Sequence, residues 1–174
     1  PNFFRFNLDG SNAALNQLAA CSVRYTGRSP IGELVELAHR ITMAGRTQLE
    51  LFHPDDPDLA FLYGTILTDG GYGEDAPSAN VCVFAEREVD RSPTGSGVTA
   101  RMALMHRRRQ VQPGSIRRFA SRTGAVFTGQ VVQEERLGVL PAVRVEVAGR
   151  AHFTGTGRFT LEEDDQIGRG FLLG

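Results

Sequence analysis

The spacing of apolar residues switches between two patterns along the chain, and this switching limits the possible folds most strongly. Residues 30–44 and 94–109 carry apolar side chains at helical spacing, which predicts two helices. Elsewhere the chain has short apolar runs or alternates between apolar and polar residues, as β-strands do. The predicted strands are 48–52, 61–67, 80–84, 125–132, 143–147 and 153–161, with an earlier one at Phe3, Phe4, Phe6 and Leu8. Many strands and two helices predict an α+β domain.

Both predicted helices have boundary signals. Ser29 and Pro30 are typical of an N-cap and a first helical position, and Gly45 is a typical stop. Thr94 is a good N-cap type for the second helix. The run Arg107–Arg109 falls at the end of that helix. Positive charges there offset the helix dipole, so we interpret the run as structural rather than as a nucleic-acid site.

Length and charge limit the domain count and the partners. The 174 residues predict a single domain over 1–174 with a core large enough to fold without disulfides or metals. Nineteen basic and 20 acidic residues leave a net charge of −1, which gives no indication of a nucleic-acid or membrane partner. The sequence has neither a membrane-length apolar run nor a secretory signal, so a cytoplasmic location is expected. It begins with Pro1 rather than Met, which indicates a processed, trimmed or partial chain.

All 19 basic residues are arginine. The absence of lysine excludes, for this chain, a pyridoxal phosphate Schiff base and the lysine of a phosphate-binding P-loop. Cys21 and Cys82 are far apart, which argues against a disulfide or zinc framework, and Cys82 is interpreted as a buried strand residue. The histidines show no metal-ligand spacing: His39, His53, His106 and His152. The sequence therefore predicts no metal and no cofactor.

Two other polar features are interpreted as turns. Asp69 precedes Gly70 and Gly71, where a side chain that accepts hydrogen bonds stabilises a turn. The acidic residues 162–165 are expected to form a solvated turn rather than a calcium loop.

The stretch from Phe84 to Arg101 contains the clearest candidate site. A strand ends, Pro93 sets a turn, and a helix begins at Thr94 with the small residues Gly95, Ser96 and Gly97. Open N–H groups and the helix dipole make such a start suitable for an anion such as a carboxylate. The alternative is a structural helix whose glycines allow close packing. A P-loop does not fit the spacing, and a nucleophile elbow would need glycine in place of Thr94.

Residues 90–101, Asp-Arg-Ser-Pro-Thr-Gly-Ser-Gly-Val-Thr-Ala-Arg, resemble the second active-site motif of the proline racemase family. Members of that family usually have cysteine where Thr94 stands. Threonine there is similar to the branch of trans-3-hydroxy-L-proline dehydratases. Residues 151–171 are similar to the C-terminus of the family, and Asn2–Phe4 and His53–Pro54 show weaker similarity.

The resemblance implies a fold and a missing partner. The implied fold is that of diaminopimelate epimerase, with mixed or antiparallel strands around a central helix. The family's first-half motif, Met-Cys-Gly-His, is absent from this sequence. The chain is therefore expected to be the second half of a two-domain enzyme, with the catalytic base in the first half. A homodimer is a further possibility.

The resemblance also implies residue roles. Gly95 and Ser96 match positions that hold the substrate carboxylate, and Asp90 matches an aspartate that contacts the ring nitrogen. Phe84 matches an apolar wall residue. The alternatives are a solvated turn for Asp90 and core packing for Phe84. Thr94 matches the second catalytic position, where an alcohol is a poor base without an activating neighbour.

Three functions follow from these observations. The first is cofactor-independent dehydration of trans-3-hydroxy-L-proline to pyrroline-2-carboxylate. The second is racemisation of proline or 2-epimerisation of hydroxyproline, which threonine at position 94 disfavours. The third is a non-catalytic amino-acid-binding module, because this chain alone lacks a base.

Overall fold

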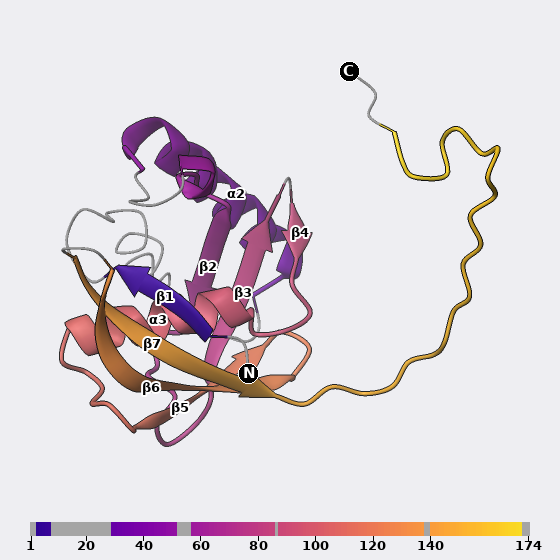
Figure 1. The fold of residues 1–174 in the computed structure, drawn as a ribbon. Coiled ribbons are helices and arrows are strands. Elements are labelled where there is room, and N and C mark those ends of the chain that lie inside the picture. The colour runs from indigo at the N-terminus through magenta and orange to yellow at the C-terminus, as the bar shows by residue number, and fades with distance from the viewer. Residues whose placement is uncertain (1–2, 8–28, 52–56, 86, 138–139, 172–174) are drawn as a thin grey trace.

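The structure is a computed structural model of the 174-residue chain (Figure 1). It describes residues 3–7, 29–51, 57–85, 87–137 and 140–171. Several residues used above lie outside these ranges, among them Asn2, Leu8, Cys21, His53 and Pro54.

The described strands form one mixed sheet. Its seven strands are β1 (Phe3–Asn7), β2 (Gly64–Thr68), β3 (Ser78–Phe84), β4 (Glu88–Val89), β5 (Ile116–Ser121), β6 (Val126–Leu137) and β7 (Leu140–Gly149). Their order is β1-β7-β6-β5-β3-β2, and β4 pairs with β3 outside this path. Only the β3–β5 pairing in the described sheet is parallel.

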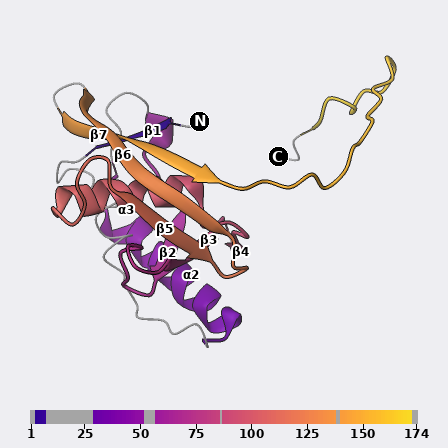
Figure 2. The same ribbon diagram turned by 90° about the horizontal axis from the view of Figure 1, so that it is seen from below.

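Helix α3 (Gly95–Arg107) lies inside the curve of the sheet (Figures 1 and 2). Val98, Met102 and Met105 are buried, as their spacing predicted. They pack in one cluster with residues of β5, β6 and β7, including Phe119, Val131, Val143 and Val145. A buried helix surrounded by strands is the arrangement expected from the family resemblance.

Helix α2 (Ile31–Gln48) packs on the opposite face of β2 and β3. Leu34 and Ala38 contact Leu67, Val81 and Val83 in a second core cluster. Because side chains alternate along a strand, Cys82, which lies between Val81 and Val83, points the other way, toward α3. The two sides of β3 therefore serve two different cores.

The end of α2 corrects two predictions. Gly45 does not stop the helix, which continues to Gln48, and residues 48–51 are not a strand. A Cβ at position 45 would lie 2.6 Å from Cδ2 of the buried Leu62. The glycine thus allows close packing instead of ending the helix. A 3-10 turn at Pro57–Leu59 precedes β2. The strand begins at Gly64 rather than at the predicted residue 61.

The predicted strand at 153–161 is wrong. Residues 150–171 leave β7 as an exposed, extended segment (Figure 1). Phe153 and Phe159 are each 96% exposed. Alternating residues indicate a strand only where a neighbouring strand supplies hydrogen-bond partners, and in the described residues this segment has none. The acidic residues 162–165 form an exposed turn, as predicted.

The other predicted elements are confirmed with shifted ends. The strands predicted at Phe3–Phe6, 80–84, 125–132 and 143–147 correspond to β1, β3, β6 and β7. Cys82 is a buried residue of β3, and the run Arg107–Arg109 lies at the C-terminal end of α3. None of the helices that the structure describes is long and apolar enough to cross a membrane.

Gly129 of β6 lies close against α3. A Cβ there would lie 2.8 Å from both Val98 Cγ1 and Met102 Cγ, and 3.3 Å from Phe119 Cε2. We expect Gly129→Ala to lower the free energy of unfolding by about 1–3 kcal/mol, because overpacked cores must shift. Gly32→Ala is the matched control, since nothing lies within 4 Å of its added methyl. Urea denaturation of both variants tests this, and equal midpoints would contradict the close packing.

Candidate active site

The turn before α3 is built by side chains that bind the main chain. The Asp90 N–H donates to the Cys82 carbonyl at 3.1 Å, which joins the turn to β3. The Ser92 N–H donates to Asp90 Oδ1 at 2.8 Å, and the Thr94 N–H donates to Ser92 Oγ at 3.0 Å. Aspartate and serine favour such local bonds, which explains why this sequence forms a turn here.

Thr94 stands at the N-cap position, but its side chain does not cap the helix. This corrects the expectation that its hydroxyl would do so. The hydroxyl instead donates to Asp90 Oδ2 at 2.8 Å. A hydroxyl has one proton, so Thr94 is left with lone pairs for any ligand while this bond persists. The structure thus brings together Asp90 and Thr94, two of the predicted site residues.

The first turn of α3 is open to a ligand. Gly95, Ser96 and Gly97 have no acceptor within the helix for their N–H groups, and Thr94 supplies none. Nothing lies within 4 Å of where a Cβ of Gly95 would be, and Ser96 is exposed. The positive end of the helix dipole adds to these free donors, so the turn is suited to a carboxylate.

Cys82 lies beneath Thr94 and is only 6% exposed. Burial raises the pKa of its thiol, the hydrogen bond with Thr94 lowers it, and the negative charge of Asp90 raises it; the net change is upward. The thiol is therefore neutral at physiological pH and cannot act as the missing base. Cys82 is free and unpaired among the described cysteines.

Phe84 follows Cys82 by two residues, so the two side chains lie on the same face of β3. It is half-buried and stacks on Tyr63, with ring centroids 5.3 Å apart. Tyr63 also meets Phe61 edge-on, and both Phe61 and Tyr63 are more than half exposed. Phe61, Tyr63 and Phe84 thus form a partly exposed aromatic row. Such a row is more typical of the wall of a ligand site than of a closed core. Sequence reasoning assigned no role to Tyr63, which precedes Gly64, the residue paired with Phe84 at the end of β3.

The remaining polar candidates lie apart from this site. His106 Nε2 lies 2.8 Å from Glu134 Oε1 near the C-terminal end of α3. Within the described ranges, no three His, Cys, Asp or Glu side chains are grouped so that they could hold a metal ion.

The family model for proline racemase matches residues 20–172. This match includes the whole turn and helix start described above. The chain belongs to the proline racemase family.

Several relatives resemble this proline racemase family chain over most of its length. It is 53% identical over 146 residues to the trans-L-3-hydroxyproline dehydratase of Bos taurus, and 52% identical over 144 residues to the trans-3-hydroxy-L-proline dehydratase of Homo sapiens. These matches cover 82% and 81% of this chain but 41% and 40% of the relatives. The chain therefore spans about two fifths of their length.

The fold of the chain is that of the family. A hydroxyproline epimerase from Agrobacterium vitis, solved with bound trans-4-hydroxy-L-proline, superposes with a TM-score of 0.67 at 26% identity. The superposition covers 81% of this chain and 40% of the epimerase chain. The diaminopimelate-epimerase-like α+β fold expected from the motif is confirmed.

Asp69 stabilises the loop that connects β2 and β3. Its carboxylate accepts bonds from the N–H groups of Gly71 and Ala79, both at 2.9 Å, and from Ser78 Oγ at 2.8 Å. Burial raises the pKa of Asp69, but these bonds and the nearby charge of Arg101 outweigh it, so the pKa is lowered. The predicted turn role is confirmed.

We expect Asp69→Asn to destabilise the protein by about 1–2 kcal/mol at neutral pH, since bonds to a partly exposed charge contribute modestly. A lowered pKa in the folded state means that this contribution is present above the unfolded value of about 3.9. It is lost as the pH falls through the folded pKa. Unfolding free energies of the variant and wild type should therefore converge in acid.

Asp75→Asn, at an exposed aspartate of the same loop, is the control and should leave stability unchanged. A stability difference for Asp69→Asn that stays constant from pH 7 to the acid limit would contradict the ionic role.

Proposed function

We propose that this chain forms half of the active site of a trans-3-hydroxy-L-proline dehydratase. The observation that carries the proposal is the hydroxyl of Thr94, bound to Asp90 at 2.8 Å beside an open helix start. A carboxylate is too weak a base to deprotonate an alcohol, so Thr94 is a poor second acid–base group for inverting Cα even with Asp90 beside it. The high identity to curated dehydratases supports the same reaction.

In this proposal the substrate carboxylate binds at Gly95 and Ser96. Their N–H groups have no acceptor within α3, and no atom of the described residues lies within 4 Å of where a Cβ on Gly95 would be. Charge-assisted hydrogen bonds to these donors would hold the carboxylate without any lysine.

Asp90 would contact the ring ammonium. Each of its carboxylate oxygens accepts one bond within the protein, from the Ser92 N–H and from Thr94 Oγ1. A carboxylate oxygen can accept two bonds, so each retains capacity for a charged N–H. Phe84, on the row with Tyr63, would supply an apolar wall to the ring.

The proposed reaction is an elimination that needs one base. A base on the first half removes the Cα proton, and that electron pair forms the Cα–C3 double bond as the C3–O bond breaks. The 3-hydroxyl leaves with a proton as water. The resulting enamine tautomerises to pyrroline-2-carboxylate. Neither oxidant nor cofactor appears in this balance, and Cys82, neutral and buried, takes no part.

The first half of the enzyme is the main proposed partner. This chain spans about two fifths of the length of its curated relatives, and Ser96 at the helix start is exposed. We propose that residues 1–174 form one domain and that the other half supplies the base across a cleft. A homodimer of the complete enzyme and a cytoplasmic location belong to the same proposal.

Two other functions remain as outcomes of the test. The Agrobacterium vitis neighbour is a hydroxyproline epimerase, so epimerisation of hydroxyproline is the second candidate. A binding module without turnover is the third, because the sequence lacks the Met-Cys-Gly-His motif of the family's first half. Thr94 disfavours the epimerase, and the identity to dehydratases favours an enzyme over a binding module.

The full-length enzyme should convert trans-3-hydroxy-L-proline to pyrroline-2-carboxylate without added cofactor. Product can be followed by trapping the cyclic imine and by mass spectrometry, which shows loss of water. Inverted substrate on chiral analysis would support the epimerase instead, and binding without turnover would support the module.

Replacing Thr94 tests its part in the reaction. In the full-length enzyme, Thr94→Cys should add Cα epimerisation, because a thiol has some thiolate near neutral pH and can serve as the second acid–base group. Thr94→Ser is the matched control, which keeps a hydroxyl and should gain no epimerase activity. Chiral chromatography of recovered substrate measures both. If the cysteine variant leaves Cα unchanged, this account of Thr94 is wrong.

A further inference from the structure

Thr94 has an unusual main-chain conformation. Its φ is 68° and its ψ is 105°, in the region that favours glycine. For a β-branched residue this conformation is strained, and it persists only where the surroundings enforce it. The groups that enforce it therefore determine where the Thr94 hydroxyl and the helix start point.

The peptide between Pro93 and Thr94 is held at both of its polar atoms. Its carbonyl, on the buried Pro93, accepts a bond from Asn80 Nδ2 at 2.9 Å. Its N–H donates to Ser92 Oγ at 3.0 Å. Ser92 belongs to the local turn, whereas Asn80 belongs to β3 and is 1% exposed. The long-range restraint on this peptide is thus Asn80.

Arg101 determines which way the Asn80 amide points. Arg101 Nη1 donates to Asn80 Oδ1 at 2.6 Å. A guanidinium can only donate, so the oxygen of Asn80 must face Arg101 and its NH₂ must face Pro93. Arg101 is on α3, two turns after Thr94, and is itself buried. The hydrogen bonds therefore run in one direction, because Arg101 donates to Asn80 and Asn80 donates to the Pro93 carbonyl.

Arg101 is itself held from three sides. Its Nη2 donates to the Gly71 carbonyl at 2.8 Å and to Ser78 Oγ at 2.9 Å. Ser78 in turn donates to Asp69, and the Arg101 guanidinium lies 4.8 Å from the centre of the Phe119 ring. Burial lowers the pKa of Arg101 to about 10, partly offset by the charge of Asp69. The side chain therefore stays charged at neutral pH.

We infer that Arg101 and Asn80 are positioning residues of this site: together they hold the Pro93–Thr94 peptide and so aim the Thr94 hydroxyl and the first N–H groups of α3. This inference rests on the function proposed above. Neither side chain is placed to touch the substrate, since both are buried behind the turn. Sequence reasoning assigned no role to either residue.

Asn80→Asp tests the bond between Asn80 and the Pro93 carbonyl. An aspartate keeps an acceptor for Arg101 and gains an opposite charge beside it, but it cannot donate to the Pro93 carbonyl. In the full-length enzyme the variant should stay folded with a lowered melting temperature, because the buried Pro93 carbonyl loses its donor. Its kcat/KM should fall about 10²-fold, mostly in kcat, because misplacement of about 1 Å at a reacting site has that effect.

Arg101→Lys tests the second link. A single ammonium cannot reproduce the fork that reaches Asn80, Ser78 and Gly71 together. We expect a similar loss of kcat/KM, and faster amide exchange in the peptide covering residues 92–98, measured by mass spectrometry.

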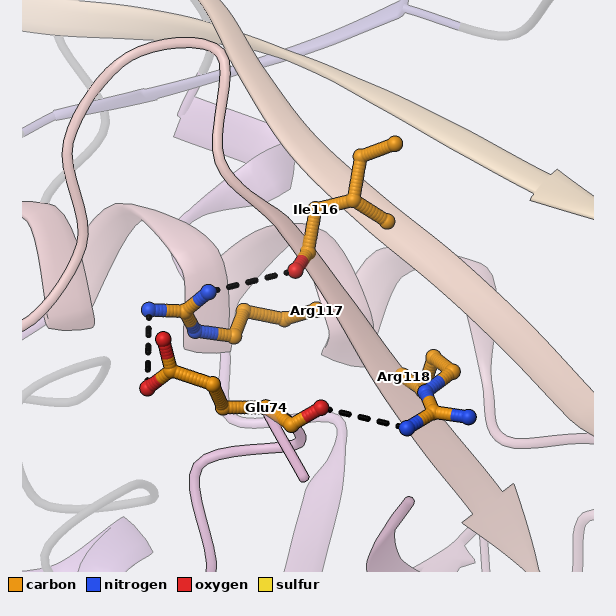
Figure 3. Close-up of polar contacts among 4 residues, drawn as sticks. All are labelled: Glu74, Ile116, Arg117 and Arg118. Atoms are coloured by element: carbon orange, nitrogen blue, oxygen red, sulfur yellow. Dashed lines mark hydrogen bonds and ion pairs between the residues drawn. The ribbon is translucent and has the colours of Figure 1, made fainter. Parts of the chain in front are cut away.

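Arg117→Lys is the matched control. Arg117 is as buried as Arg101, at 8% exposure each, but it lies on β5 and contacts the Ile116 carbonyl and Glu74 instead of the turn (Figure 3). This variant should lower the melting temperature while leaving kcat/KM and exchange at residues 92–98 unchanged.

The outcomes separate this inference from the proposed function. Wild type without dehydratase activity refutes the function, and exchange at residues 92–98 in the three variants then decides the positioning by itself. The inference is overturned if Asn80→Asp and Arg101→Lys keep kcat/KM within about threefold of wild type. It is also overturned if Arg117→Lys loses activity equally, since the role would then be only structural.

Discussion

The burial of α3 inside the curved sheet is the constraint on which the rest of the structure depends. Two glycines permit it, because a Cβ on Gly129 would meet Val98 and Met102, and a Cβ on Gly97 would collide with Ile66 of β2. Because the helix is fixed against the strands, the position of its N-terminal turn is fixed as well. The open N–H groups, Thr94 and Asp90 are all aimed by this packing, so the apolar core determines the orientation of the polar site.

The polar groups around the helix start form two shells with different partners. The outer shell is local: Asp90, Ser92 and Thr94 bind one another within one turn of chain. The inner shell is long-range, because Asn80 and Arg101 connect that turn to β3 and to the loop of Gly71. A buried charge must be paired or hydrogen-bonded to be tolerated, and Arg101 meets this requirement with three oxygen acceptors. Arg101 thereby connects the loop that carries Asp69 to the candidate site.

Several features of the chain fit the proposal that it forms one side of a larger active site. Ser96 is exposed while Thr94 and Gly95 are half-buried, the aromatic row at Phe61, Tyr63 and Phe84 is partly uncovered, and residues 150–171 extend away from the core. The relatives are about two and a half times as long as the matched region. Dividing a site between two halves lets each supply one type of group. In the proposed enzyme this half would bind the carboxylate and ammonium, and the other half would contribute the base.

The sequence by itself determined the α+β class, the central helix and the family, because hydrophobic spacing and a twelve-residue motif are local properties. It also identified Asp90, Thr94, Gly95 and Ser96 as one group, since they are neighbours in the chain. Only the tertiary structure decided the rest. Gly45 packs against Leu62 instead of ending α2, residues 153–161 have no strand partner, and the Thr94 hydroxyl binds Asp90 instead of capping the helix. Arg101 and Asn80 are 21 residues apart and meet only because α3 packs on β3. Such contacts depend on which elements pack together in space, and the spacing of residues along the chain does not specify that packing.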